Sequence, residues 1–282
     1  MKFAFLILHY QNIDVTLSCI DSINSKCLGR DYEIIVVDNN SPNKSGVLLK
    51  QKFADNSLVT VIISDKNLGF AKGNNLGFAY IKSKICPNYI IMTNSDTEIM
   101  DVSFLDRIES IDLEQAPAVI GPQIILANGE IGKYPFEAVN TKYLKKEIIH
   151  FFIKRFLYVI GLAKLVRMLE KESTQKNVKD DDWKIAHENV VLNGCCLIFT
   201  KKYIDLFDGI FDQTFMYKEE QFLFYRLERA SLSSFYSPDI RIKHLERAST
   251  NGVEKQKVID FYSREIASDK LLIKYLKDET LL

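Results

Sequence analysis

The stretch FAFLILHYQN at residues 3–12 decides the fold class of this chain. Its first six residues, Phe3 to Leu8, form a continuous apolar run, which is typical of a strand buried on both faces of a sheet. The run stops abruptly at the polar pair His9-Tyr10. The same change from apolar to polar recurs twice, at Tyr32 to Val37 followed by Asp38-Asn39, and at Tyr89 to Met92 followed by Asn94-Ser95-Asp96.

Segments with helical spacing separate these strands, at residues 13–25 and 71–84, and another strand is expected at Leu58 to Ile63. This alternation predicts an α/β fold with a Rossmann-like, mostly parallel central sheet and flanking helices. Ligands of such sheets bind beyond the carboxyl ends of the strands. The polar strand ends therefore predict a binding site at one edge of the sheet, although Asp and Asn are also ordinary turn residues.

The second half of the chain is less regular. Residues 140–185 differ in composition from their surroundings, since an apolar and basic stretch is followed by an almost wholly polar one. This segment predicts a helical insertion at about residues 140–185. The other expected elements are strands at Ala118 to Leu126, Val190 to Phe199, Ser234 to Tyr236 and Ile240 to Lys243, and helices near Lys201, at Glu219 to Ala230 and at Lys255 to Lys277.

Bulk composition excludes several classes of protein. The chain has 282 residues with 37 basic and 37 acidic side chains, a balance that predicts no nucleic-acid partner. Its five cysteines form no CxxC pair, which indicates reduced thiols in the cytoplasm. The N-terminal apolar run is too short for a signal peptide, and no run reaches the roughly 18 apolar residues of a membrane span.

Two segments suggest a site for a phosphate and a metal ion. The glycine-rich stretch Asn67 to Gly77 follows a strand and opens a helix, so backbone N–H groups could face an anion, although a simple turn would look the same. Asp96 follows a strand end, where a carboxylate suits Mg²⁺ or Mn²⁺ bound to a diphosphate. The alternative for Asp96 is a helix N-cap.

Two other features are weaker alone. Glu219 and Glu220 begin a predicted helix, where the dipole favours acidic residues without any catalytic role. Adjacent helical side chains diverge by about 100°, so we expect only one of the pair to face a cleft. His244 follows a short strand, and a lone histidine is usually structural.

Together these segments resemble the family 2 glycosyltransferases of the GT-A fold, especially bacterial enzymes that build O-antigen, capsule or rhamnose-containing polysaccharides. The resemblance covers residues 1–130 and 188–250. The pieces that carry it are His9 to Asn12, Val37 to Ser41, Asn67 to Asn75, Asn94-Ser95-Asp96, Asn193-Gly194-Cys195, Phe215 to Glu220, Arg226, and His244 with Ser249.

The resemblance implies a role for each site residue. Asp96 takes the last position of the family's Asp-x-Asp metal motif, with Asn94 in place of the first Asp, and His244 completes the Mg²⁺ or Mn²⁺ site. Glu219-Glu220 takes the place of the family's Glu-Asp pair that supplies the general base, with Glu220 as first choice and Glu219 as second. The residues expected at the nucleotide are His9, Tyr10, Asp38, Asn67, Gly73, Asn74 and Ser95.

The implied reaction is an inverting transfer of a sugar from UDP-hexose or dTDP-rhamnose to a hydroxyl of a surface-polysaccharide or polyprenyl-linked glycan. The chain is then one domain over residues 1–270, with a nucleotide-binding half (1–115), an acceptor and catalytic half (116–250) and a C-terminal helix (about 255–277). Two alternatives stay open: a nucleotidyltransferase, and an inactive sugar-binding protein of the same fold.

The insertion allows a separate prediction. Ile148 to Leu169 mixes bulky apolar residues with Lys154, Arg155, Lys164, Arg167 and, just beyond, Lys171. A basic amphipathic helix of this kind can lie in a membrane interface, which would make the protein peripheral on the inner face of the plasma membrane. The alternative is a helix that packs on the protein's own core or on a second subunit in a homodimer.

Overall fold

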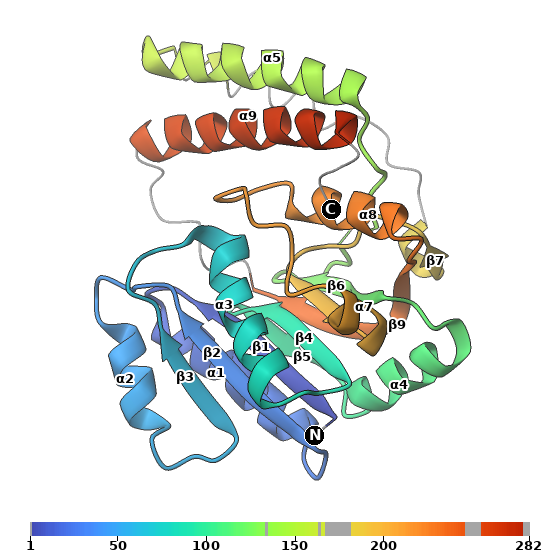
Figure 1. Cartoon of the computed structure of the whole chain (residues 1–282). Coiled ribbons are helices and arrows are strands. Elements are labelled where there is room, and N and C mark those ends of the chain that lie inside the picture. Colours follow the sequence, from blue (N-terminus) through green and yellow to red (C-terminus); the bar gives the residue numbers. More distant parts are fainter. Residues whose placement is uncertain (1, 133–134, 163–164, 167–181, 246–254, 279–282) are drawn as a thin grey trace.

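One mixed sheet runs through the molecule (Figure 1). The computed structural model describes residues 2–132, 135–162, 165–166, 182–245 and 255–278. Within these residues the sheet has nine strands in the order β3-β2-β1-β4-β8-β6-β9-β5, and β7 pairs with β9 outside this path.

The first part of the sheet is parallel, as the alternating sequence pattern predicts. The strands β1 (Phe3–His9), β2 (Tyr32–Asp38), β3 (Val59–Ile63) and β4 (Tyr89–Asn94) alternate with the helices α1 (Ile13–Lys26), α2 (Ser45–Lys52) and α3 (Gly69–Lys84). In the register of β1, His9 lies opposite Asp38 and Leu8 lies opposite Asn94. The three polar strand ends therefore meet at one edge of the sheet.

The second part of the sheet is mixed rather than mostly parallel. β8 (Cys196–Phe199) runs antiparallel between β4 and β6 (Val119–Leu126), and β5 (Thr97–Ile99) and β7 (His187–Glu188) run antiparallel to β9 (Ser234–His244). β9 forms one strand where the sequence predicts two. Its pairing with β6 jumps from Ser237 to Arg241, and Pro238 inside this bulge has no N–H to donate to a ladder.

Helices cover both faces of the sheet. α1 and α4 (Phe104–Gln115) pack on one face, around Ile20, Phe104 and Ile108. α3, α7 (Lys201–Leu206) and α8 (Glu219–Arg229) pack on the other, around Phe78, Tyr203 and Leu223. A short 3₁₀ helix, η1 (Asp182–Lys184), precedes β7.

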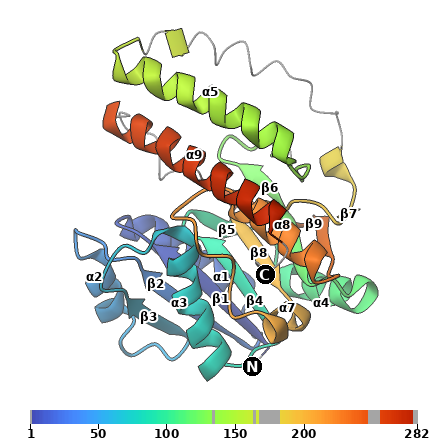
Figure 2. The ribbon, with the colours of Figure 1, turned by 45° about the horizontal axis from the view of Figure 1, so that its top comes forward.

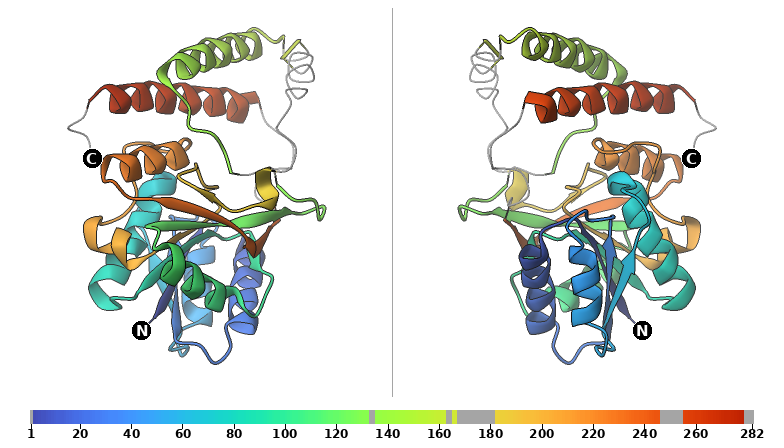
Figure 3. Two further views of the ribbon diagram at one scale, coloured as in Figure 1. Left: turned by 90° about the vertical axis from the view of Figure 1, so that its right-hand side faces the viewer. Right: turned by 90° about the vertical axis from the view of Figure 1, so that its left-hand side faces the viewer.

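Two long helices form an outer layer over α8. α9 (Lys255–Lys277) packs on α8 through Leu272, Tyr275 and Phe222, and α5 (Thr141–Val159) packs along α9. Figures 1, 2 and 3 show α5 on the side of α9 that faces away from the sheet. None of the helices in the described part of the chain has the length and the apolar composition of a membrane span.

The prediction that the basic residues of the insertion form one exposed face of a helix is wrong for two of them. Lys154 is buried, and Arg155 donates from Nε to Ser263 Oγ of α9 at 2.8 Å, so both side chains face inward. Lys164, Arg167 and Lys171, and also Leu169, lie outside the described residues.

Candidate active site

A cleft of about 440 Å³ opens beside the end of β4. It brings together segments that are far apart in the sequence, including the expected catalytic pair and the expected metal-binding histidine. Its lining residues are Phe70, Asn94, Asn193, Gly194, Cys195, Met216, Tyr217, Lys218, Glu219, Glu220, His244 and Glu265.

The pairing of β5 with β9 brings Asp96 to His244. Thr97 lies opposite His244 in that ladder, and Leu245 donates its N–H to the Asp96 carbonyl at 2.8 Å. Asp96 Oδ1 then lies 3.2 Å from His244 Nε2. The structure therefore places the two residues expected to share a metal ion side by side at the edge of the cleft.

The donor atoms of this pair suit some divalent cations better than others. A carboxylate oxygen with an imidazole nitrogen fits Mn²⁺, whereas Mg²⁺ prefers oxygen ligands alone. Within the described ranges no group of three or more His, Cys, Asp or Glu could hold a metal ion. Phosphate oxygens of a substrate or water would have to complete the coordination of a metal bound by Asp96 and His244.

The two glutamates at the start of α8 have different surroundings. Glu219 is buried, and Thr214 Oγ1 donates to its Oε1 at 3.1 Å. Burial, together with the neighbouring charge of Glu220, raises the pKa of Glu219 to about 7. This carboxyl group braces the beginning of the helix. Glu219 and Glu220 both line the cleft, so the expectation that only one of the pair would face it is wrong.

Glu220 lies directly against the backbone of Gly194. A Cβ on residue 194 would stand 2.5 Å from Glu220 Oε1, so a larger residue there would displace the Glu220 carboxylate from its present position. Burial raises the pKa of Glu220. Hydrogen bonds from the backbone N–H groups of Glu220 and Gly194 and the charge of Lys218 lower this pKa, but by less than burial raises it. A carboxylate with a raised pKa at the wall of a cleft is suited to accept a proton.

Lys218, which immediately precedes the pair, is bound by three carboxylates that the sequence did not reveal. Its Nζ lies 2.8 Å from Glu147 of α5, and 3.3 Å and 3.5 Å from Asp269 and Glu265 of α9. Lys218 and Tyr217 both have positive φ, at 69° and 80°. These ion pairs hold a strained turn next to Glu219 and Glu220.

The turn before α8 also contacts both the C-terminal helix and the glycine-rich segment. Ser268 of α9 donates from Oγ to the Met216 carbonyl at 2.9 Å, and Phe70 donates its N–H to the Phe215 carbonyl at 2.9 Å. Gly69 has φ +79°, and a Cβ there would collide with the Phe215 carbonyl oxygen. Residues 215–218 therefore connect the expected nucleotide segment with α9.

Most of the glycine-rich segment serves packing. A Cβ on Gly73 would stand 2.7 Å from Leu8 Cδ1, so this glycine lets α3 lie close to β1. Asn74 is buried and donates from Nδ2 to the Phe70 carbonyl at 3.0 Å. Asn67 is exposed, and its Oδ1 accepts from the N–H of Gly69 and from Nδ2 of Asn39.

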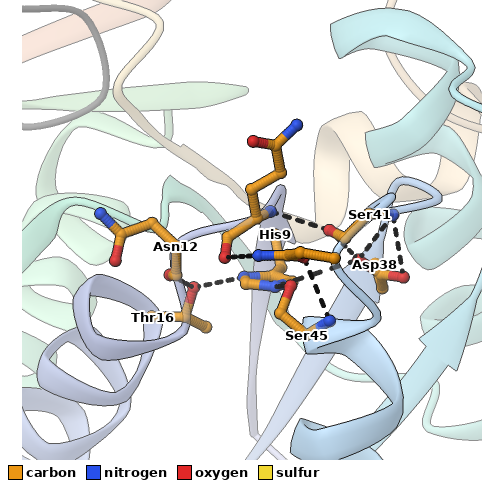
Figure 4. Close-up of polar contacts among 8 residues, drawn as sticks. His9, Asn12, Thr16, Asp38, Ser41 and Ser45 are labelled. Atoms are coloured by element: carbon orange, nitrogen blue, oxygen red, sulfur yellow. Dashed lines mark hydrogen bonds and ion pairs between the residues drawn. The ribbon is translucent and has the colours of Figure 1, made fainter. Parts of the chain in front are cut away.

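His9 and Asp38 form a closed cluster of hydrogen bonds at the ends of β1 and β2 (Figure 4). The ring nitrogens of His9 lie 2.7 Å from Thr16 Oγ1 and 2.7 Å from Ser45 Oγ. Asp38 Oδ1 accepts from Ser41 Oγ at 2.5 Å, and His9 Nε2 lies 3.9 Å from the same oxygen.

Burial separates this cluster from solvent. The side chains of His9 and Asp38 are 0% and 4% exposed, and burial lowers the pKa of His9 despite the nearby carboxylate. Ser41, Ser45 and Gly46 pack directly against these two side chains. Tyr10, at 46% exposure, is the accessible side chain at this strand end, and Ser95 is half-buried between Asn94 and Asp96.

Comparison with known proteins identifies the family. The family model described as Glycosyl transferase family 2 matches residues 5–168, which is more than half of the chain. The chain therefore belongs to the family 2 glycosyltransferases. No curated protein matches it.

Solved structures agree with this assignment at the level of the fold. A crystal structure of S. aureus TarS 1-349 in complex with UDP-GlcNAc is 13% identical, with a TM-score of 0.54 over 99% of this chain and 72% of that one. The same protein in complex with UDP is 14% identical, with a TM-score of 0.54 over 96% and 66%. This likeness confirms the expected GT-A fold, and the chain spans about two thirds of the length of the second structure.

Proposed function

We propose that this chain is a metal-dependent, inverting glycosyltransferase that moves a sugar from a UDP- or dTDP-linked donor to a hydroxyl of a surface-polysaccharide or lipid-linked glycan. The observation that carries the proposal is that Glu219, Glu220 and His244 line one cleft, with Asp96 in contact with His244. Family membership supports sugar transfer, and the TarS complexes with UDP and UDP-GlcNAc show that a protein of this fold binds such donors.

In this proposal Glu220 is the general base. The acceptor hydroxyl gives its proton to the Glu220 carboxylate while its oxygen bonds to the anomeric carbon and the bond to the diphosphate oxygen breaks. One direct displacement inverts the anomeric centre. Burial of Glu220 supports the assignment, because a raised pKa makes the carboxylate a stronger acceptor near neutral pH.

Asp96 and His244 would hold a divalent metal ion beside the leaving group of the reaction. Such an ion neutralises the charge that develops on a departing nucleoside diphosphate. Tyr10, Asn67 and Ser95 are the accessible or half-buried residues among those expected at the nucleotide. We assign donor binding to residues 1–115 and acceptor binding to residues 116–250, which contribute Gly194 and the glutamate pair to the cleft.

Two other functions make different predictions. A nucleotidyltransferase would release pyrophosphate from a nucleoside triphosphate, whereas a sugar transferase releases a nucleoside diphosphate from a nucleotide sugar. An inactive sugar-binding protein would bind donors without turnover. Family 2 membership favours the transferase over both alternatives.

The test is a panel of UDP- and dTDP-sugars incubated with the purified chain and Mn²⁺ or Mg²⁺. We expect UDP or dTDP to raise the melting temperature, and at least one donor to release its nucleoside diphosphate. EDTA should stop this release, because Asp96 and His244 alone do not neutralise the leaving group. Full activity in EDTA would exclude the metal, and pyrophosphate release from a triphosphate would replace the proposal by nucleotidyl transfer.

A further inference from the structure

The two faces of α5 differ sharply in what they contact. One face packs on α9 through Leu144, Phe151 and Tyr158, with ring centroids of Phe151 and Tyr158 5.8 Å and 6.0 Å from that of Tyr262. Glu147 on this face reaches Lys218. These contacts are spaced by three, four and seven residues, which places them on one side of a helix.

The opposite face is apolar and exposed. Its large side chains have exposures from 48% to 61% and recur at positions 0, 3, 4, 7 and 11 along the helix. These residues are Ile149, Phe152, Ile153, Phe156 and Ile160. Figures 1 and 3 place α5 itself at the outer surface of the molecule, beyond α9. A row of exposed apolar side chains on one helix indicates a surface that contacts a membrane or a protein.

The charges on α5 favour an anionic partner. Lys142, Lys145 and Lys146 are exposed in its first turns. Glu147 is the one acidic residue between positions 141 and 160, and its carboxylate is bound inward to Lys218. The outer surface of α5 therefore combines apolar side chains with lysines and carries no carboxylate to offset them.

This combination fits a lipid surface better than a protein. Protein interfaces are depleted in lysine, whereas lysines beside an apolar helix face are typical of helices that lie in a membrane interface. A symmetric contact with a second copy would bring two lysine-bearing faces together without an acidic residue of α5 to pair with them.

We propose that α5 binds the surface of a membrane that contains anionic lipid. The face from Ile149 to Ile160 would lie at the boundary between head groups and acyl chains, and Lys142, Lys145 and Lys146 would lie near the lipid phosphates. α9 joins α5 to the cleft, which Glu265 of α9 lines. If the proposed function holds, this contact brings the cleft to the place where a polyprenyl-linked acceptor is anchored.

Flotation of the whole chain with phosphatidylcholine vesicles, with and without phosphatidylglycerol, tests the contact. Binding should require phosphatidylglycerol and should fall as salt is raised. Lys145→Glu with Lys146→Glu should weaken binding by about tenfold or more, given the usual contribution of a lysine near an anionic surface. Phe152→Ser with Phe156→Ser should abolish insertion without changing the charge.

The matched control is Lys50→Glu with Lys52→Glu on α2, where both lysines are exposed far from α5. It should float like the unmodified chain, and so should Glu220→Gln, because flotation does not depend on catalysis. Equal flotation of the α5 charge variant and the unmodified chain would overturn the proposal. A dimer in light scattering that dissociates with Phe152→Ser and Phe156→Ser, in a chain that binds no vesicles, would assign the face to a second copy.

Discussion

Two polar clusters lie near the same edge of the sheet, and they differ in how their charges are satisfied. The His9 and Asp38 cluster is closed, since Thr16, Ser41 and Ser45 supply its hydrogen bonds at 2.5–2.7 Å. The glutamate pair of α8 instead lines an open cleft, and burial raises the pKa of both carboxyl groups.

If the proposed function holds, the difference separates a cluster that stabilises the fold from a pair of carboxyl groups that meets the substrate. Buried polar groups with complete hydrogen bonds stabilise one conformation, whereas a carboxylate with a perturbed pKa at a cleft is available to a substrate. We therefore expect substitutions in the first cluster to change stability, and substitutions of Glu220 to change the rate of transfer.

Glu220→Gln should have the largest effect. The amide keeps the size of the side chain and removes its ability to accept a proton, so transfer should fall by roughly 10²–10⁴-fold. The shift in melting temperature with UDP or dTDP should stay near that of the unmodified chain, because in the proposed mechanism the base acts on the acceptor. Rates of transfer and thermal shifts measured on the same preparation check both expectations.

The matched control for this variant is Glu219→Gln, one residue away. It should reduce transfer much less, because Glu219 is bonded to Thr214. Loss of transfer in Glu219→Gln alone, with donor binding intact, would exchange the roles of the two residues. Wild-type transfer by Glu220→Gln would remove general-base catalysis by this residue.

Glu219→Gln should change the pH dependence of stability. Burial raises the pKa of Glu219 from 4.5 to about 7, so the folded chain binds this proton more tightly than the unfolded chain. The free energy of unfolding contributed by this group therefore falls as pH rises through that interval. Glutamine removes the titration, and the variant should be more stable above pH 7 by up to about 3 kcal/mol.

Urea unfolding of both proteins at pH 5 and pH 8 measures this effect. Asp269, whose pKa is also raised to about 7, is present in both proteins, and its contribution cancels in the difference. If the free energies of unfolding of the two proteins differ by the same amount at pH 5 and at pH 8, Glu219 does not titrate in this range.

Asp38→Ala should have the smallest of the three effects and should act on stability. It leaves the Ser41 hydroxyl and backbone N–H without their buried acceptor, which costs about 2 kcal/mol. Asp55→Ala, on an exposed carboxylate, is the control and should stay within about 0.5 kcal/mol. Complete loss of UDP binding with no loss of stability would mean that Asp38 belongs to the donor site and that the two clusters do not differ as described.

Much of the fold could be predicted because the apolar runs and the polar strand ends repeat along the first half of the chain. The strands at Phe3, Tyr32 and Tyr89 begin where the sequence predicts them, and the register confirms that their polar ends meet. α2 and α4 were not predicted, and the periodicity of α2 is weak because Ser45 and Gly46 are its buried first residues. The direction of β8 depends on pairing between distant strands, which local sequence does not encode.

The candidate site was predictable only as far as its motifs lie within short segments. Asp96, His244 and the glutamate pair could be named because the family resemblance is carried by the short segments that contain them. Glu147, Glu265 and Asp269 could not, since they are ordinary acidic residues on long helices until the fold brings them to Lys218. The hydrogen bonds of His9 to Thr16 and Ser45 could not be predicted either, because only the fold brings these side chains together.

The dependence of Lys218 on α9 has a consequence for the order of events during translation. A chain emerges from the ribosome N-terminus first, so the parallel strands and the glycine-rich segment are available to fold early. Glu265 and Asp269 emerge 47 and 51 residues after Lys218, and until then the strained turn before Glu219 lacks two of its three carboxylate partners. We therefore expect a nascent chain to form its parallel N-terminal strands before the cleft, with the glutamate pair ordered among the last parts to form.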